Sequence, residues 1–92
     1  MKREFKLIYT KRFLKMLSKL EMSLTKKVRE KLILLQHEDN HEALKVHKLK
    51  GKLSDKYSFS IDRKNRIVFE YENGNLILLL AVDDHDIYNI DL

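Results

Sequence analysis

The chain has 92 residues, which is enough for one domain with a modest core and too few for two, so we expect a single domain over residues 1–92. It contains no cysteine, which excludes disulfides and thiolate metal sites and fits a reducing cytoplasm. No apolar run is long enough to span a bilayer, and the charges at Lys2, Arg3, Glu4 and Lys6 are unlike a signal peptide, so we expect no membrane association.

Positive charge is concentrated in two stretches of the chain. Residues 1–31 hold eleven Lys and Arg against three Glu, a net charge of +8, and residues 45–66 hold eight Lys and Arg against two Asp, a net charge of +6. Residues 67–92 hold six acidic residues and no Lys or Arg. Solvated lysines are common on helix surfaces, but this clustering favours a polyanion such as RNA, or an acidic protein, as the partner.

The first forty residues predict a strand and two helices. Residues 4–9 alternate between polar and apolar, which is typical of a strand. Thr10 is a suitable cap for a helix over residues 11–21, and Ser23 for a second helix over residues 24–37. The apolar residues at helical spacing are Phe13, Leu14, Met16, Leu17 and Leu20 in the first helix, and Leu24, Val28, Leu32 and Leu35 in the second. The short link between them predicts an antiparallel pair.

Beyond Gly51 the hydrophobic period changes from that of a helix to that of a strand. Residues 57–61 and 66–71 alternate, with a tight turn at residues 62–65 between them. Asn73-Gly74 is a strong hairpin signal. The apolar run that follows, over residues 76–82, is typical of a central strand covered on both faces.

These elements predict an α+β fold in the order β-α-α-β-β-β, an antiparallel twisted sheet with the helical pair on one face. We expect ten side chains to be buried between sheet and helices: Tyr57, Phe59, Ile61, Ile67, Phe69, Leu78, Leu80, Leu17, Val28 and Leu32.

Residues 37–41, His-Glu-Asp-Asn-His, match the zinc-protease signature H-E-x-x-H. That motif requires His37 and His41 on one helix face, with a third ligand from elsewhere. Asp39 and Asn40 are poor helix formers at an expected helix end, and the next turn offers no third ligand. We therefore interpret the segment as a solvated helix terminus, and expect neither a metal site nor another cofactor.

Histidines stand just before and just after the predicted hairpins, at His47 and His85, and Arg66 opens a strand between them. Histidine serves as acid or base because its pKa lies near the working pH, and the carboxylates of Asp84 and Asp86 favour the imidazolium form of His85. A guanidinium can grip two phosphate oxygens at once. Such a set suits cleavage of a phosphodiester without metal.

Three lysines follow His47 at alternate positions: Lys48, Lys50 and Lys52. In an extended segment this spacing sends them to one side, where they can contact phosphate, and Arg63 in the turn is a more peripheral RNA contact. Simpler explanations exist. His47 also fits a solvated loop, Arg66 a surface salt bridge to Glu70 or Asp62, and the C-terminal segment packing on the sheet.

A family pattern runs through the same region. Residues 49–58 read Leu-Lys-Gly-Lys-Leu-Ser-Asp-Lys-Tyr-Ser, and residues 66–69 read Arg-Ile-Val-Phe. With His85 and Tyr88 near the end, this resembles the RelE/ParE superfamily of bacterial and archaeal toxins, nearest to its RelE, YoeB and YafQ-type ribonucleases. The resemblance implies a RelE-like fold.

The resemblance also implies a function: the toxin of a type II toxin–antitoxin system, which cuts mRNA in the ribosomal A site, without metal, by attack of the RNA 2′-hydroxyl. It places His47 where YafQ-type enzymes carry a histidine and YoeB-type enzymes a glutamate, both used for proton transfer. It implies that Lys50 and Arg66 contact the scissile phosphate. His85 then acts as the acid, while Tyr88 stacks on a base or donates a proton.

The implied partners are the ribosome with its mRNA and a short acidic antitoxin that wraps the sheet and helices. Lys26 and Lys27, on the basic helices, would face ribosomal RNA. Two other functions remain open: a ParE-like inhibitor of DNA gyrase, which needs no histidine pair, and a non-catalytic module that binds an antitoxin as a co-repressor.

The chain departs from the family pattern at two places. Several relatives carry basic residues along the second strand, where this chain has Ser58 and Ser60. Asp83 and Asp84 add negative charge beside the expected site. Both departures weaken phosphate binding.

Overall fold

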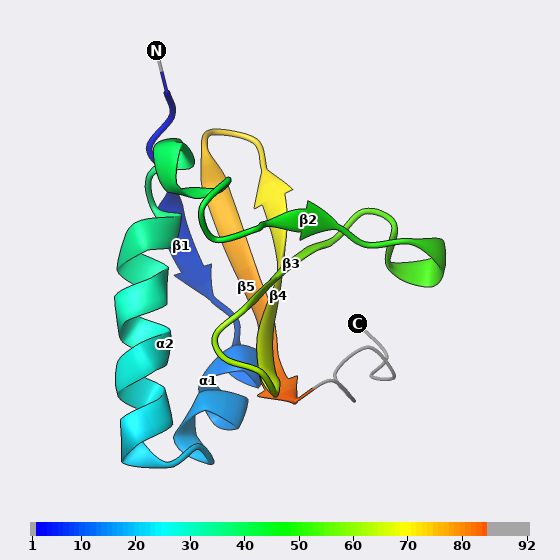
Figure 1. Cartoon of the computed structure of the whole chain (residues 1–92). Coiled ribbons are helices and arrows are strands. Elements are labelled where there is room, and N and C mark those ends of the chain that lie inside the picture. Colours follow the sequence, from blue (N-terminus) through cyan, green and yellow to red (C-terminus); the bar gives the residue numbers. More distant parts are fainter. Residues whose placement is uncertain (1, 85–92) are drawn as a thin grey trace.

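The computed structural model describes residues 2–84, which form a five-stranded sheet with two α-helices (Figure 1). The elements in chain order are β1 (Lys6–Tyr9), α1 (Lys11–Ser18), α2 (Met22–Leu35), β2 (His47–Lys48), β3 (Tyr57–Ser60), β4 (Asn65–Glu72) and β5 (Leu76–Asp84). Short 3₁₀ turns occupy Glu38–Asn40 and Gly51–Leu53. No helix within residues 2–84 is long and apolar enough to cross a membrane. The α+β prediction is confirmed.

The sheet is mixed, with strand order β1-β5-β4-β3-β2. The pairs β3–β4 and β4–β5 are antiparallel, as expected. The pair β2–β3 is also antiparallel, but the strand β2 was not predicted. β1 runs parallel to β5, in register from Lys6 opposite Leu76 to Tyr9 opposite Leu79. The expected wholly antiparallel sheet is therefore wrong at this one pair. Two helices separate β1 from the hairpin strands, so no tight turn forces β1 to reverse against its neighbour.

The main core lies between the sheet and the helices. Six of the ten predicted core residues are buried there: Phe59, Ile61, Ile67, Phe69, Val28 and Leu32. Phe13, Leu35, Ile77 and Leu79, which are fully buried, also belong to this core. Each such side chain contributes about 1.5–3 kcal/mol by leaving water. Tyr57 and Leu17 pack at the margin of this core and are only partly buried.

The prediction for Leu78 and Leu80 on β5 is wrong, since both are only partly buried and Ile77, Leu79 and Val82 face the helices instead. A continuous apolar run carries no alternation, so the sequence does not reveal which residues face inward. The register between β4 and β5 also shifts between Val68 and Phe69. Such a bulge inverts the order of faces along a strand.

The second face of the sheet carries a smaller cluster of apolar residues: Val68, Ala81, Leu80, Leu49 and Met16. β5 is thus covered on both faces, as its sequence predicts. The uncovered part of this second face is where the candidate site lies.

The caps and turns differ in how well they match their predictions. Thr10 caps α1 as expected, since its Oγ1 accepts from the Phe13 N–H at 3.1 Å and donates to the Leu79 carbonyl at 2.7 Å. Ser23 does not cap α2, because that helix already begins at Met22, after Glu21. Asp62 closes the β3–β4 turn, where its Oδ1 accepts from the Lys64 and Asn65 N–H groups.

Candidate functional site

The candidate site is built on β2, β3 and β4, on the face of the sheet that turns away from the main core. His47 pairs with Ser58, and Arg66 pairs with Ser60. Directly opposed residues point to the same face, and so do residues two apart on a strand. His47 and Arg66 therefore lie on one face, in successive rows of the sheet, as the ribonuclease prediction requires.

His47 lies at the free edge of the sheet, exposed, on the two-residue strand β2. Its Nδ1 is 3.0 Å from the carbonyl oxygen of Lys45, a residue held in the left-handed region with φ of 60°. When Nδ1 carries the proton and donates it to this carbonyl, Nε2 is left as the proton acceptor. The backbone thus favours the tautomer that a general base needs.

A hollow of about 340 Å³ adjoins His47 and is lined by His47, Leu49, Lys50, Lys52 and Leu53. Lys50 and Lys52, two of the three predicted lysines, therefore line the same hollow as His47. The chain bends here as expected, because Gly51 takes a φ of +68° and opens the turn that carries Lys52.

The prediction that all three lysines share one side is wrong for Lys48. This residue pairs with Tyr57, and Tyr57 packs against the main core. Because opposed residues share a face, Lys48 points to the opposite face from His47. The extended segment ends at Gly51, before the alternation reaches Lys52.

The guanidinium of Arg66 forms a hydrogen bond with Ser60. Its Nη1 donates to the Ser60 Oγ at 2.7 Å, across the β3–β4 pair. Among residues 2–84 it forms no ion pair with Glu70 or Asp62, since Glu70 pairs with Lys56 and Asp62 accepts from the turn amides. Ser60, which departs from the family pattern, is thus a positioning residue that the sequence did not reveal.

Lys56 is a second residue that the sequence did not single out. Its side chain is only 9% exposed, and its Nζ lies 3.0 Å from both Asp55 Oδ1 and Glu70 Oε1. Burial alone would lower the pKa of Lys56, but the hydrogen bonds to Glu70 and Asp55 outweigh it and raise that pKa. The ammonium neutralises Glu70, which lies four residues after Arg66 on β4 and points to the same face.

Acidic groups border the site on the β5 side, as predicted. Asp83 is exposed and stands directly opposite Arg66, and Asp84 stands opposite Asn65. The Asp84 N–H donates to the Asp83 Oδ1 at 2.8 Å. The predicted residues His85 and Tyr88 lie outside residues 2–84, which end here, one residue before His85.

The remaining predicted RNA contacts lie away from the hollow. Lys26 and Lys27 are exposed on α2, and Arg63 is exposed in the β3–β4 turn. Lys27 and the turn residue Lys64 line a common depression where the helical pair meets that turn. Lys27 also helps to hold the pKa of Asp62 below its usual range, after the larger effect of the turn N–H groups.

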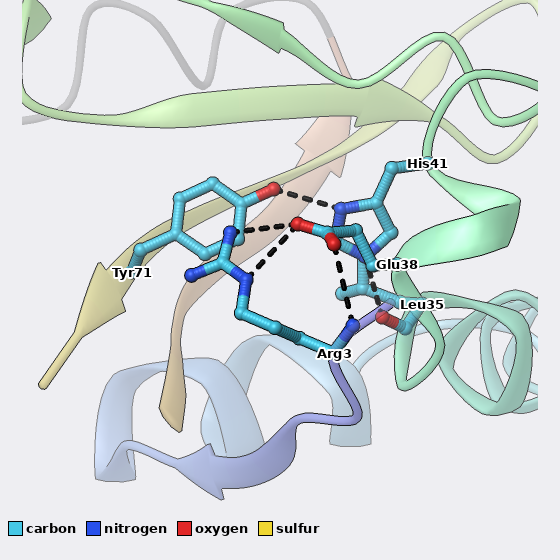
Figure 2. Close-up of polar contacts among 5 residues, drawn as sticks. All are labelled: Arg3, Leu35, Glu38, His41 and Tyr71. Carbon is cyan, nitrogen blue, oxygen red and sulfur yellow. Dashed lines mark hydrogen bonds and ion pairs between the residues drawn. The ribbon is translucent and has the colours of Figure 1, made fainter. Parts of the chain in front are cut away.

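His41, the second histidine of the H-E-x-x-H match, has a structural role (Figure 2). Its Nδ1 lies 2.8 Å from the Tyr71 hydroxyl, its Nε2 lies 2.7 Å from the Leu35 carbonyl, and its ring stacks on Phe5 at 5.3 Å. His37 instead lies 3.5 Å from Glu4. Because α2 ends at Leu35, the two histidines share no α-helix, as expected. The segment is solvated at His37, as predicted, but the prediction is wrong for His41, which is partly buried.

Comparison with solved structures identifies the fold. The chain superposes on E. coli RelE with a TM-score of 0.71 at 21% identity, covering 94% of this chain and 92% of that one. It superposes on E. coli YafQ with a TM-score of 0.71 at 12% identity, covering 92% of this chain and 98% of that one. It superposes on one chain of the toxin–antitoxin complex RelBE2 of Mycobacterium tuberculosis with a TM-score of 0.71 at 16% identity, covering 89% of this chain and 99% of that one. The fold is that of RelE-like toxins.

A family model identifies the family to which the chain belongs. The HigB-like toxin family, described as the RelE-like toxin of the type II toxin–antitoxin system HigB, matches residues 3–85. This match spans most of the chain, which therefore belongs to that family. No curated protein sequence matches it significantly.

Proposed function

We propose that this toxin is an mRNA endoribonuclease that acts on translated mRNA in the cytoplasm, on the ribosome and without a metal. The observation that carries the proposal is the cluster of His47, Lys50 and Lys52 around one hollow, with Arg66 one row further on the same face. A proton acceptor beside fixed cations is what cleavage of RNA by its own 2′-hydroxyl requires.

In the proposed reaction, His47 Nε2 removes the proton from the 2′-hydroxyl, and the 2′-oxygen attacks the adjacent phosphorus. The bond to the 5′-oxygen breaks, leaving a 2′,3′-cyclic phosphate. Arg66 and Lys50 stabilise the charge that develops on the phosphoryl oxygens. His85 protonates the departing 5′-oxygen, and Tyr88 stacks on a base or donates a proton. The roles of His85 and Tyr88 rest on the family resemblance.

The arrangement around Arg66 supports its proposed role. Ser60 orients the guanidinium through one nitrogen, Nη1. Lys56 neutralises Glu70, the acid on the same strand and face. The proposed substrate also reaches Lys52 beside the hollow and, more peripherally, Arg63, Lys26 and Lys27.

The proposed partners are the ribosome and an antitoxin. The chain is similar to one chain of RelBE2, which is a toxin–antitoxin complex, and its own family is described as the toxin of such a system. An acidic antitoxin matches the two positive stretches of the chain.

Cleavage of a defined mRNA tests this function directly. Purified chain is mixed with that mRNA, with and without programmed ribosomes, and the new ends are analysed chemically. We expect cleavage in the translated region, a 2′,3′-cyclic phosphate or its hydrolysis product, and no effect of brief EDTA exposure when ribosome integrity is monitored. His47→Ala should slow cleavage by about 10²–10⁴-fold, the usual contribution of a general base.

His37→Ala is the matched control, because it removes an exposed histidine that contacts Glu4 away from the hollow. Intact mRNA with the wild-type chain, or equal rates for the two histidine variants, would favour gyrase inhibition or a non-catalytic binding module instead.

A further inference from the structure

A tight turn directly precedes His47 in the chain. The Lys45 N–H donates to the Glu42 carbonyl at 3.0 Å, and the Val46 N–H donates to the His41 carbonyl at 3.0 Å. Lys45 itself lies in the left-handed region, with φ of 60°. These two bonds around one left-handed residue form a Schellman motif, where glycine is the usual residue. A lysine is strained there, so the turn depends on support from its surroundings.

The turn presents a backbone carbonyl to the histidine that follows it. The Nδ1 of His47 lies 3.0 Å from the Lys45 carbonyl oxygen. Because a carbonyl oxygen only accepts, Nδ1 carries the proton in the neutral ring. The same bond orients a side chain that is otherwise exposed at the free edge of the sheet. Both the tautomer and the orientation of His47 therefore depend on where the turn holds this carbonyl.

The side chain of His41 connects the turn to distant parts of the fold (Figure 2). Its Nε2 lies 2.7 Å from the Leu35 carbonyl at the end of α2, and its Nδ1 lies 2.8 Å from the Tyr71 hydroxyl on β4. Since the carbonyl only accepts, Nε2 carries the proton and Nδ1 accepts from the tyrosine. The ring also stacks on Phe5, just before β1, at 5.3 Å. One side chain thus links the turn to α2, β4 and the start of the sheet.

The backbone of His41 completes the path to His47. Its carbonyl accepts the N–H of Val46, the residue immediately before His47. Leu44 is buried in the main core and keeps the segment on the sheet, so the ring of His41 sets the orientation of the turn rather than its location. Without this ring the turn loses its bonds to α2 and β4, and the Lys45 carbonyl is no longer fixed relative to β2.

We propose that His41 is a positioning residue for the general base. It holds the left-handed turn whose Lys45 carbonyl keeps the proton of His47 on Nδ1, which leaves Nε2 free to accept a proton. His41 is partly buried and takes no part in the proton transfer itself. The role of His47 as the base rests on the proposed function, whereas its tautomer does not.

Nitrogen-15 NMR of the free chain, labelled in its four histidines, tests the proposal. At about pH 8.5 the imidazoles are neutral, and protonated and unprotonated ring nitrogens resonate at different positions. We expect the proton of His47 on Nδ1 and that of His41 on Nε2. In His41→Ala the Nδ1–H fraction of His47 should fall at least about twofold, because an unheld ring shares its proton between both nitrogens. His37→Ala, which removes the exposed histidine beside Glu4, should leave that fraction unchanged.

Lys45 offers a matched pair of variants. Lys45→Gly and Lys45→Val remove the same exposed charge. Glycine adopts the left-handed conformation freely and should keep the Nδ1–H signal of His47, whereas the β-branched valine disfavours it and should lose that signal as His41→Ala does. Amide spectra establish that each variant is folded. If His41→Ala does not fold, Tyr71→Phe replaces it, because it removes one of the two bonds to the ring, and a smaller loss is expected.

Single-turnover cleavage of mRNA on saturating ribosomes is measured for the same variants. His41→Ala should slow the chemical step about tenfold and leave ribosome affinity within about twofold, since it acts on the orientation of the base. An Nδ1–H signal of His47 that survives in His41→Ala, or equal signals in the two Lys45 variants, overturns the proposal. Wild-type cleavage with an unchanged rate in His41→Ala rejects the positioning role alone. The expected tautomers without any wild-type cleavage reject the ribonuclease function alone.

Discussion

At the scale of single residues, the candidate site depends on how its charges are compensated. Arg66 stands between Ser60, which bonds its guanidinium, and Asp83, which opposes it on β5. Glu70 points to the same face but is neutralised by Lys56. Arg66 therefore faces one exposed carboxylate across the sheet rather than two, which leaves a net positive surface toward β2.

The Ser60 contact predicts a measurable loss of activity. Ser60→Ala removes one hydrogen bond to a charged group, worth about 1–1.5 kcal/mol, and should lower the cleavage rate roughly five- to tenfold. The reason is that the guanidinium is no longer oriented, although its charge remains. Single-turnover cleavage of a short mRNA on the ribosome measures the rate.

Ser18→Ala serves as the control for this change, since Ser18 is an exposed serine on α1 that bonds only its own helix, at the Lys15 carbonyl. Equal rates for Ser60→Ala and the wild type would show that Ser60 does not position Arg66.

The Lys56 contacts predict a change in stability. Lys56→Met leaves Glu70, whose side chain is 22% exposed, without its cation, and should lower the free energy of unfolding by about 1–3 kcal/mol. Urea denaturation at neutral pH measures it. The double variant Lys56→Met/Glu70→Leu should recover most of the loss, because the charge it still leaves without Lys56, that of Asp55, is 69% exposed to water. A double variant no more stable than the single one would contradict this account.

At the scale of elements, the sequence predicts those parts of the fold that local patterns determine. Thr10 and the apolar spacing locate α1, and Asp62 and Asn65 locate the β3–β4 turn. The β5 faces, the parallel β1–β5 pair and the two-residue strand β2 depend on contacts between distant segments. A run of Leu and Ile over residues 76–80 reads the same in either register, so only the bulge observed in the structure decides which side is buried.

The end of α2, the segment before β1 and the strand β4 meet around Tyr71 (Figure 2). Tyr71 bonds His41 and packs on Phe5, and Arg3 lies over both aromatic rings. Burial, which is the largest effect, raises the pKa of the Tyr71 phenol to about 12. This junction joins three elements that are far apart in sequence.

The raised pKa of Tyr71 predicts alkaline destabilisation. An unfolded tyrosine ionises near pH 10, so between about pH 10 and 12 the unfolded state loses this proton before the folded state does. The stabilising contribution is present below about pH 10 and is lost as pH rises toward 12. Tyr71→Phe should therefore show a shallower fall in unfolding free energy from pH 9.5 to about 11 than the wild type. Urea denaturation across this range measures both slopes, and identical slopes would show that Tyr71 is not the group responsible.

At the scale of the whole molecule, the two edges of the sheet carry different surfaces. The edge at β2 carries the hollow with His47, and the edge at β1 lies beside a groove between β1 and α2. The clustering of Lys and Arg in the sequence indicates the cations around the hollow. The sequence does not predict Ser60 or Lys56 as supports of Arg66, because their roles follow from cross-strand placement and burial.

Lys26 tests the proposed role of the helix cations. Lys26→Ala removes an exposed charge from α2, and should weaken ribosome binding and reduce the magnitude of the salt slope of log K against log salt by about 1. The rate of the chemical step at saturating ribosome should not change. Binding isotherms at several salt concentrations measure the slope, and an unchanged slope would place Lys26 outside the RNA interface.

The most direct test of the ribonuclease function is to map mRNA 5′ ends in cells after brief induction of the chain without its antitoxin. We predict growth arrest and new 5′ ends within translated regions. Arg66→Ala should reduce cleavage by about 10²–10³-fold, the cost of losing one electrostatic contact in the transition state, and His85→Ala should have a comparable effect. Growth arrest that persists in both variants, with no new mRNA ends, would contradict the ribonuclease function.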